Sequence, residues 1–69
     1  MPHYYVNDKA QQNGDHEVHT DTCRYRPNLL GGTDLGKHLS CQSAVEEAKK
    51  RGYKQVNGCY YCSRECHTQ

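Results

Sequence analysis

The chain lacks the large apolar side chains from which a small domain normally builds its core. Its 69 residues include no Ile, Phe or Trp, and the hydrophobic fraction reaches only 33% when every Tyr, Ala and Cys is counted. A chain of this size buries about 60% of the surface that its unfolded form exposes, and ordering it costs on the order of 100 kcal/mol. Because so few apolar side chains do not offset that cost by burial alone, the sequence predicts a cross-link.

The rest of the composition excludes several classes of protein. No stretch approaches the ~20 consecutive apolar residues of a membrane span, and the opening Met-Pro-His-Tyr-Tyr-Val lacks the charged and apolar regions of a signal peptide. Nine basic and eight acidic residues leave a net charge of +1, which is no polybasic footprint. We expect one domain over residues 1–69 and a monomer without membrane contact.

The cysteines indicate the cellular compartment. There are five, an odd number, whereas a disulfide framework normally uses an even number and follows a secretion signal. We therefore expect a cytoplasmic protein with reduced thiols, in which clustered cysteines bind metal or act in redox chemistry. A secreted, disulfide-paired form is the alternative.

Two short strands are expected near the N-terminus. Tyr4–Val6 is rich in β-forming residues, and His16–Thr20 alternates around Val18. Asn13-Gly14 favours a turn between them, which predicts a hairpin. Residues 1–15 thus form an N-terminal strand and a polar loop. The following segment, residues 21–36, reads as irregular, and residues 37–39 as a short third strand.

A helix is predicted over residues 41–51. Ser40 is a suitable N-cap, Ala44 and Ala48 mark one apolar face, and Gly52 suits the left-handed position after a helix. A turn at Asn57-Gly58 should follow, and residues 63–69 form a short tail with one helical turn. The predicted fold is a small α+β zinc domain in which two to three short antiparallel strands pack on one helix.

Cys59-x-x-Cys62 is the strongest chemical signal. Two thiolates at this spacing bind one ion, but a tetrahedral site needs a second pair of ligands. His19-x-x-x-Cys23 is the best candidate, because it lies where the predicted second strand ends. Thiolates with one imidazole favour a single structural Zn²⁺. Alternatives for the fourth ligand are Cys66, His67 and His16.

Other cysteines and the tyrosines have simpler interpretations. Cys41 is expected to be a small buried residue at the helix start. Cys66 could pair with Cys41 on oxidation, act as an alternative ligand or stay free, and we expect it to stay free. The six tyrosines are expected mainly to fill the core, since Phe and Trp are absent.

These pieces resemble a known zinc module, the N-terminal metal-binding domain of the adaptive-response DNA methyltransferase Ada and its short HxxxC…CxxC relatives. The resemblance covers roughly residues 17–62. It also extends to small uncharacterised bacterial proteins with a cysteine-rich tail. It implies a zinc ion held on an α+β scaffold and a nucleic acid as partner. The matching pieces are Val18-His19, Cys23, Leu39-Ser40, Ala44 to Ala48, Gly52-Tyr53 and Cys59 to Cys62.

The chain departs from that module at its reactive position. The methyltransferase has a nucleophilic Cys where His19 stands here, so we do not expect methyl transfer or another enzymatic activity. The resemblance places nucleic-acid contacts at cationic residues, and the candidates are Arg24, Arg26, Lys49 and Lys50.

Two functions follow from these observations. The leading hypothesis is a structural zinc module that presents a surface to a macromolecular partner, either a nucleic acid or a protein. The alternative is a thiol-based repair or redox protein that uses a zinc-bound or free cysteine.

Overall fold

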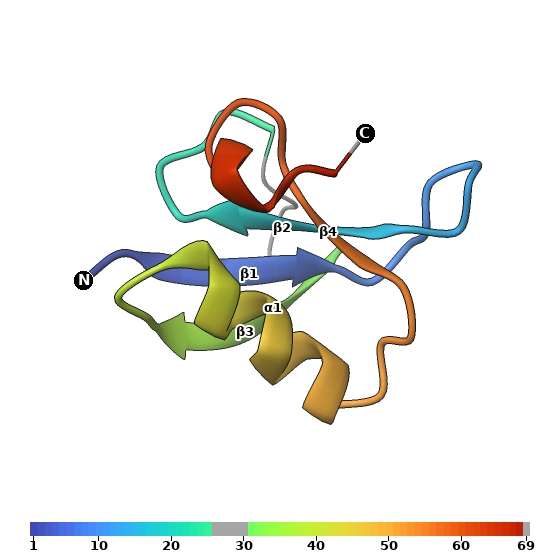
Figure 1. Ribbon diagram of the computed structural model, residues 1–69, viewed down its shortest axis with the longest axis horizontal. Helices are drawn as coiled ribbons and strands as arrows, with labels where there is room; N and C mark the ends of the chain where they lie inside the picture. Colours follow the sequence, from blue (N-terminus) through green and yellow to red (C-terminus); the bar gives the residue numbers. More distant parts are fainter. Residues whose placement is uncertain (26–30, 69) are drawn as a thin grey trace.

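The protein folds as a four-stranded mixed sheet with one α-helix. A computed structural model describes residues 1–25 and 31–68. The strands lie in the order β3-β1-β2-β4, with α1 against the sheet (Figure 1). The elements in chain order are β1 (His3–Asn7), β2 (His16–Thr20), β3 (Gly32–Lys37), α1 (Cys41–Lys50), β4 (Val56–Gly58) and a 3₁₀ turn, η1 (Arg64–Cys66).

The predicted hairpin is confirmed. β1 and β2 pair antiparallel, with Val6 opposite Val18 and Tyr5 opposite His19. In the connection between them Gly14 has a φ of +93°, a conformation that favours glycine, and its N–H donates to Gln11 at 2.9 Å. The hairpin holds both valines on the helix-facing side of the sheet, where each is fully buried.

The third strand lies earlier than the sequence predicted. β3 covers residues 32–37, most of which were expected to be irregular, and pairs antiparallel with β1. The pairing register shifts between Tyr4 and Tyr5, and Gly36 lies next to this bulge with a φ of +83°. Gly36 therefore accommodates a β-bulge, which a sequence pattern cannot distinguish from a loop.

A fourth strand replaces the turn expected at Asn57-Gly58. Val56 and Gly58 lie opposite His16 and Val18, so β4 runs parallel to β2. Gly58 serves close packing instead of a turn, because a Cβ atom there would lie 2.5 Å from the Ser63 carbonyl oxygen and 2.6 Å from Cys66 Cβ. This strand positions the cysteine motif that follows it.

The helix prediction is confirmed to within one residue. α1 ends at Lys50, and Gly52 takes a φ of +106° just after it. Ser40 occupies the N-cap position, but its side chain makes no capping hydrogen bond. Instead the Ser43 hydroxyl donates to the Ser40 carbonyl oxygen at 3.1 Å.

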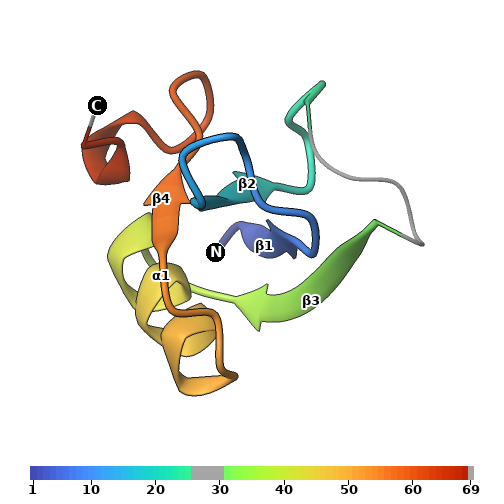
Figure 2. The same ribbon diagram turned by 90° about the vertical axis from the view of Figure 1, so that its right-hand side faces the viewer.

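The core lies between α1 and one face of the sheet. Figure 2 shows α1 on one side of the curved sheet. The helix contacts all four strands, whereas we expected two or three antiparallel ones beneath it. The α+β class is thus confirmed, while the strand number and strand direction were wrong. The buried core cluster consists of Tyr4, Val6, Val18, Leu35, Cys41, Ala44 and Ala48.

None of the described helices has both the length and the apolar character that a membrane span requires.

The tyrosines do not fill the core as predicted. Tyr4 alone among them is buried in the described part of the chain. Tyr25, Tyr60 and Tyr61 are 51%, 44% and 70% exposed. The small side chains Ala44 and Ala48 bring the helix close to the sheet, so little room remains for further aromatic rings.

Cys66 is not free, as we had expected, but forms a disulfide with Cys41. The S–S distance is 2.06 Å and the two residues are 25 positions apart. Cys41 is buried at the first position of α1, and Cys66 ends η1. The bond therefore joins the start of the helix to the C-terminal segment.

A carboxylate joins three further segments. Asp8 follows β1 and accepts hydrogen bonds at 2.7 Å from the hydroxyls of Thr33 in β3 and Tyr53 after α1. The Tyr53 hydroxyl, followed by that of Thr33, holds the pKa of Asp8 below its usual value. A lowered pKa means that the ionised carboxylate stabilises the folded state.

Replacing the Asp8 carboxylate should lower the stability of the protein only at pH values at which the carboxylate is ionised. We expect Asp8→Asn to reduce the free energy of unfolding by about 0.5–1 kcal/mol at pH 7, because Asp8 is exposed and its hydrogen bonds compete with water. The difference between wild type and variant should shrink as the pH falls below 3.8, the usual pKa of the group. Urea denaturation at several pH values measures it. A difference that is independent of pH would contradict this role.

Candidate metal centre

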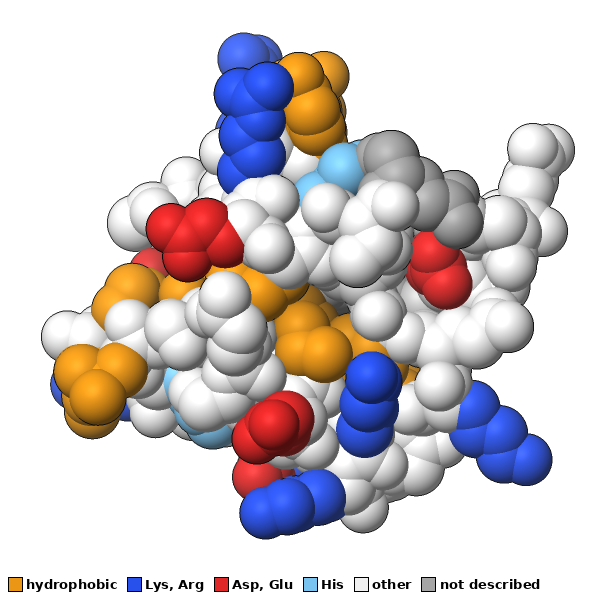
Figure 3. Space-filling model, viewed as in Figure 1, with side chains coloured by type: hydrophobic (Ala, Val, Ile, Leu, Met, Phe, Trp, Pro, Cys, Tyr) orange, Lys and Arg blue, Asp and Glu red, His pale blue; other side chains and the backbone are white. Residues whose placement is uncertain are grey.

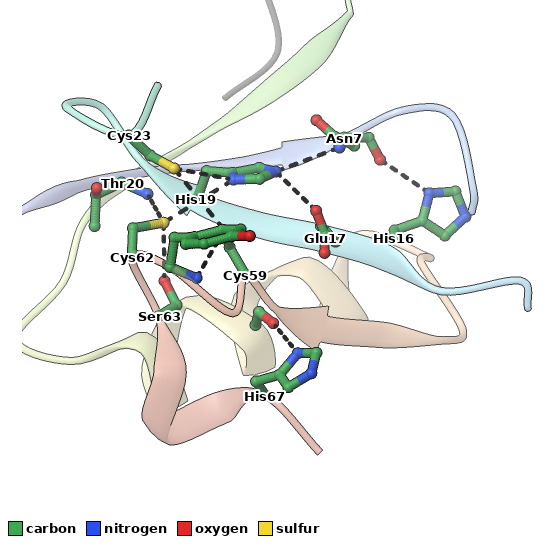
Figure 4. Close-up of polar contacts among 12 residues, drawn as sticks. Asn7, His16, Glu17, His19, Thr20, Cys23, Cys59, Cys62, Ser63 and His67 are labelled. Atoms are coloured by element: carbon green, nitrogen blue, oxygen red, sulfur yellow. Dashed lines mark hydrogen bonds and ion pairs between the residues drawn. The ribbon is translucent and has the colours of Figure 1, made fainter. Parts of the chain in front are cut away.

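Four residues predicted as ligands come together at one end of the sheet. His19 lies in β2 and Cys23 just beyond it, while Cys59 and Cys62 follow β4. Because β4 runs parallel to β2, the chain leaves both strands at the same end of the sheet. One ligand atom from each residue lies within 4.8 Å of each of the others. Figure 4 shows the side chains of His19, Cys23 and Cys62 pointing toward one another, and Cys59 Sγ lies 3.8 Å from Cys23 Sγ.

The distances fit a tetrahedral ion. Zn–S bonds of about 2.3 Å and Zn–N bonds of about 2.0 Å separate two sulfurs by about 3.8 Å, and a sulfur from a nitrogen by about 3.5 Å. The Cys23 and Cys59 sulfurs lie 3.8 Å apart, and Cys23 Sγ lies 3.6 Å from His19 Nδ1. Cys62 Sγ is somewhat farther from Nδ1, at 4.0 Å. Three sulfurs and one imidazole nitrogen are a donor set that Zn²⁺ favours, so the residues fit the ion.

The backbone around each cysteine directs N–H groups at the sulfurs. Tyr61 N–H donates to Cys59 Sγ at 3.4 Å, and Thr20 N–H donates to Cys62 Sγ at 3.3 Å. Such hydrogen bonds stabilise negative charge on sulfur. The site is also shielded from water, since His19 is 0% and Cys59 2% exposed. The surroundings therefore suit thiolates that are neutralised by a cation.

The three thiols differ in acidity. Burial raises the pKa of Cys23 to about 12, and burial likewise raises the pKa of Cys59. Burial also acts on Cys62, but hydrogen bonds, first among them that from the Thr20 N–H, lower its pKa overall. Cys62 is thus the most readily ionised of the three. Two buried thiols that hold their protons imply that a metal ion would release protons on binding.

His19 is oriented by a carboxylate on its other side. Glu17 Oε1 lies 3.3 Å from His19 Nε2, and both side chains lie on the same face of β2, two residues apart (Figure 4). The Asn7 side-chain amide also lies 3.4 Å from Nε2. With its proton on Nε2, on the side of the Glu17 carboxylate, His19 would keep the Nδ1 lone pair facing the sulfurs. Burial, opposed by Glu17, lowers the pKa of His19, which favours the neutral form that binds metals.

None of the alternative ligands joins the cluster. Cys66 is held in the disulfide. His67 Nδ1 lies 3.0 Å from the Gly58 carbonyl oxygen, and His16 Nδ1 lies 2.9 Å from the Asn7 carbonyl oxygen. Both imidazoles are therefore engaged elsewhere, as Figure 4 shows.

The predicted nucleic-acid contacts that the structure describes lie in two separate segments of the chain. Arg24 follows Cys23 directly and lies over the Tyr25 ring. Lys49 and Lys50 are in the last turn of α1. Arg26 lies outside the described residues. Of the cations predicted from the resemblance, the three that the structure describes are thus divided between the segment beside the candidate metal centre and the end of the helix.

Sequence reasoning missed Glu17 and the Thr20 N–H. A signal for Glu17 was present, since residues two apart on a strand share a face and a ligating histidine usually donates its second N–H to a carboxylate. Thr20 gave no such signal, because its contribution comes from the backbone.

Metal binding should depend on the cluster and not on the disulfide. We expect Cys59→Ser to abolish binding of one Zn²⁺, because it removes a buried thiolate from the set. The double variant Cys41→Ser/Cys66→Ser should bind one Zn²⁺ as wild type does, although losing the disulfide costs about 2–4 kcal/mol. Native mass spectrometry measures the stoichiometry. Full binding by Cys59→Ser would mean that another group completes the site.

Glu17 should tune the affinity for the ion. We expect Glu17→Gln to weaken zinc binding by about tenfold or more, since a neutral amide holds the imidazole less firmly than a carboxylate. Glu46→Gln, an exposed position on α1, is the matched control and should leave the affinity unchanged. Competition with a chromophoric chelator measures both. Equal affinities for the two variants would exclude an orienting role for Glu17.

Comparisons with known proteins provide no relative. No protein-family model matches the chain, and no significant match was found among curated proteins or solved structures. The resemblance to the Ada module accordingly rests on the short motifs alone.

Proposed function

We propose that the protein is a small zinc-stabilised module in which one Zn²⁺ bound by His19, Cys23, Cys59 and Cys62 has a structural role. The observation that carries the proposal is the convergence of three sulfurs and one imidazole nitrogen within 4.8 Å of one another. Four protein ligands fill a tetrahedral shell, so no position remains for water or substrate.

The burial of the cluster supports a structural role. Cys23, Cys59 and His19 are all buried, so the ion would be enclosed by protein. Zinc binding in such sites contributes about 10–16 kcal/mol. That contribution is large compared with what a core of two alanines, two valines and few larger side chains provides. The module would then offer its surface to a macromolecular partner.

Cys62 favours a second candidate function, a thiol protein that acts through a metal-bound or free sulfur. It is the only ligand of the four that is partly exposed. It also lines a hollow of about 240 Å³ together with Tyr4 and Leu39. A zinc-bound thiolate in such a position is open to alkylating agents.

Alkylation distinguishes the two candidates. A structural centre should protect all three free cysteines, so iodoacetamide should modify them only after chelation. Mass spectrometry would then detect three modifications and an intact Cys41–Cys66 bond. One rapid modification at Cys62 while zinc stays bound would instead support the thiol protein.

Removal of the ion should unfold the chain. We expect a strong chelator to collapse the dispersed amide signals of an NMR spectrum, because the ion joins β2 to the segment after β4. Adding Zn²⁺ back should restore them. A spectrum that stays dispersed without metal would show that the core and the disulfide suffice, and would contradict a structural role for the ion.

A further inference from the structure

The surface beside the metal centre carries an exposed group of tyrosines and arginines. We call Tyr25, Tyr60 and Tyr61, with Arg24 and Arg64, the tyrosine platform. Its three rings are between 44% and 70% exposed. In Figure 3 cationic and hydrophobic side chains stand together at the top of the molecule, where Figure 1 shows the chain after β4. Exposed aromatic side chains gathered at one place indicate an interaction surface.

The rings form a continuous aromatic surface. The ring centroids of Tyr25 and Tyr61 lie 4.8 Å apart with planes tilted by 30°, and Tyr60 meets Tyr61 edge-on at 5.2 Å. Tyr60 also contacts the His67 ring at 5.4 Å. These contacts restrict the rings before any partner binds, which lowers the entropic cost of binding.

Two exposed guanidinium groups lie against this surface. Arg64 lies 4.6 Å from the centre of the Tyr60 ring and donates to the Tyr60 hydroxyl at 2.9 Å. Arg24 lies 5.7 Å from the centre of the Tyr25 ring. Positive charge therefore stands beside aromatic faces at two points, from two separate chain segments.

The proposed metal centre explains why these segments meet. Tyr60 and Tyr61 are the two residues between Cys59 and Cys62, and Arg24-Tyr25 directly follows Cys23. Ligands on both segments would hold the rings together, so this inference rests on the proposed function. Because the ligand side chains turn inward to the ion, the intervening tyrosines face outward.

We propose that the tyrosine platform binds single-stranded nucleic acid by stacking bases on Tyr25 and Tyr61, with Arg24 and Arg64 contacting phosphates. Aromatic faces next to guanidinium groups match the alternation of base and phosphate along a single strand. In a duplex the base faces are already stacked on one another and cannot contact the rings. A proline-rich peptide would also suit aromatic rings, but it offers no charge for the two arginines.

Fluorescence anisotropy with a fluorescein-labelled, mixed-sequence 12-nucleotide DNA strand tests the platform on the zinc-loaded protein. We expect the protein to bind this single strand more tightly than the corresponding duplex. The logarithm of its affinity for the single strand should fall with the logarithm of the salt concentration with a slope of about −1.4, as two phosphate contacts require. The corresponding RNA strand should bind as well, since stacking and phosphate contacts are common to both.

Matched variants locate the contacts. Tyr61→Ala should weaken binding by about tenfold or more, whereas Tyr61→Phe keeps the ring and should bind like wild type. Arg64→Gln should reduce both affinity and salt slope, and Lys9→Gln, at an exposed position in the loop after β1, is its control. Zinc content and thermal unfolding are measured for every variant, so that loss of folding is recognised.

Several outcomes would overturn the proposal. Equal affinity for duplex and single strand, equal affinities of Tyr61→Ala and Tyr61→Phe, or binding of a proline-rich peptide in place of the oligonucleotide would each reject stacking. A folded, zinc-loaded protein that does not bind the strand would reject the platform while the metal proposal stands. A metal-free protein that binds the strand with wild-type affinity would reject the metal proposal and leave the platform supported.

Discussion

The parallel pairing of β4 with β2 is the constraint on which the rest of the molecule depends. It sets Gly58 opposite Val18. The next residues, Cys59 and His19, therefore enter the site side by side. The Cys59 N–H donates to the Val18 carbonyl oxygen at 3.0 Å and continues this register. A one-residue slip would send Cys59 to the opposite face of the sheet and away from His19. The geometry of the cluster is thus a consequence of strand register.

Gly58 allows the C-terminal segment to fold back over this register. Ser63 and Cys66 approach its Cα so closely that any side chain at Gly58 would displace them. The Ser63 N–H donates to the Cys59 carbonyl oxygen at 2.9 Å, which closes the turn around the cysteine motif. Close backbone packing at one glycine therefore connects β4, the ligands and the disulfide.

The sequence predicted the elements whose signals are local. The hairpin, the helix of residues 41–50 and the convergence of His19 and Cys23 with Cys59 and Cys62 follow from alternation, helix-end signals and ligand spacing. The strand β3 was misplaced and β4 was missed, because Gly36 lies at a bulge and Gly58 at a close contact, both of which depend on distant partners. The Cys41–Cys66 disulfide likewise joins residues whose proximity only the tertiary fold creates.

A local sequence pattern also could not predict which tyrosines are exposed. Tyr4 and Tyr5 are neighbours in β1, yet only Tyr4 faces the helix and is buried. Tyr60 and Tyr61 lie in the turn between two candidate ligands, where the cysteines occupy the interior. Which rings are buried is decided by the direction in which each backbone segment presents them, and composition does not contain that information.

The positions of Cys59, Cys62 and Cys66 have a consequence for the order of events during biosynthesis. Among the described residues, all three follow the four strands and the helix along the chain, and they carry half of the cluster and half of the disulfide. A ribosome therefore delivers the hairpin and the helix before the groups that fasten them. Until these three cysteines emerge, the nascent polypeptide has only a sparse apolar core. Cys23 then lacks the other two sulfurs of the cluster, and Cys41 lacks its disulfide partner Cys66.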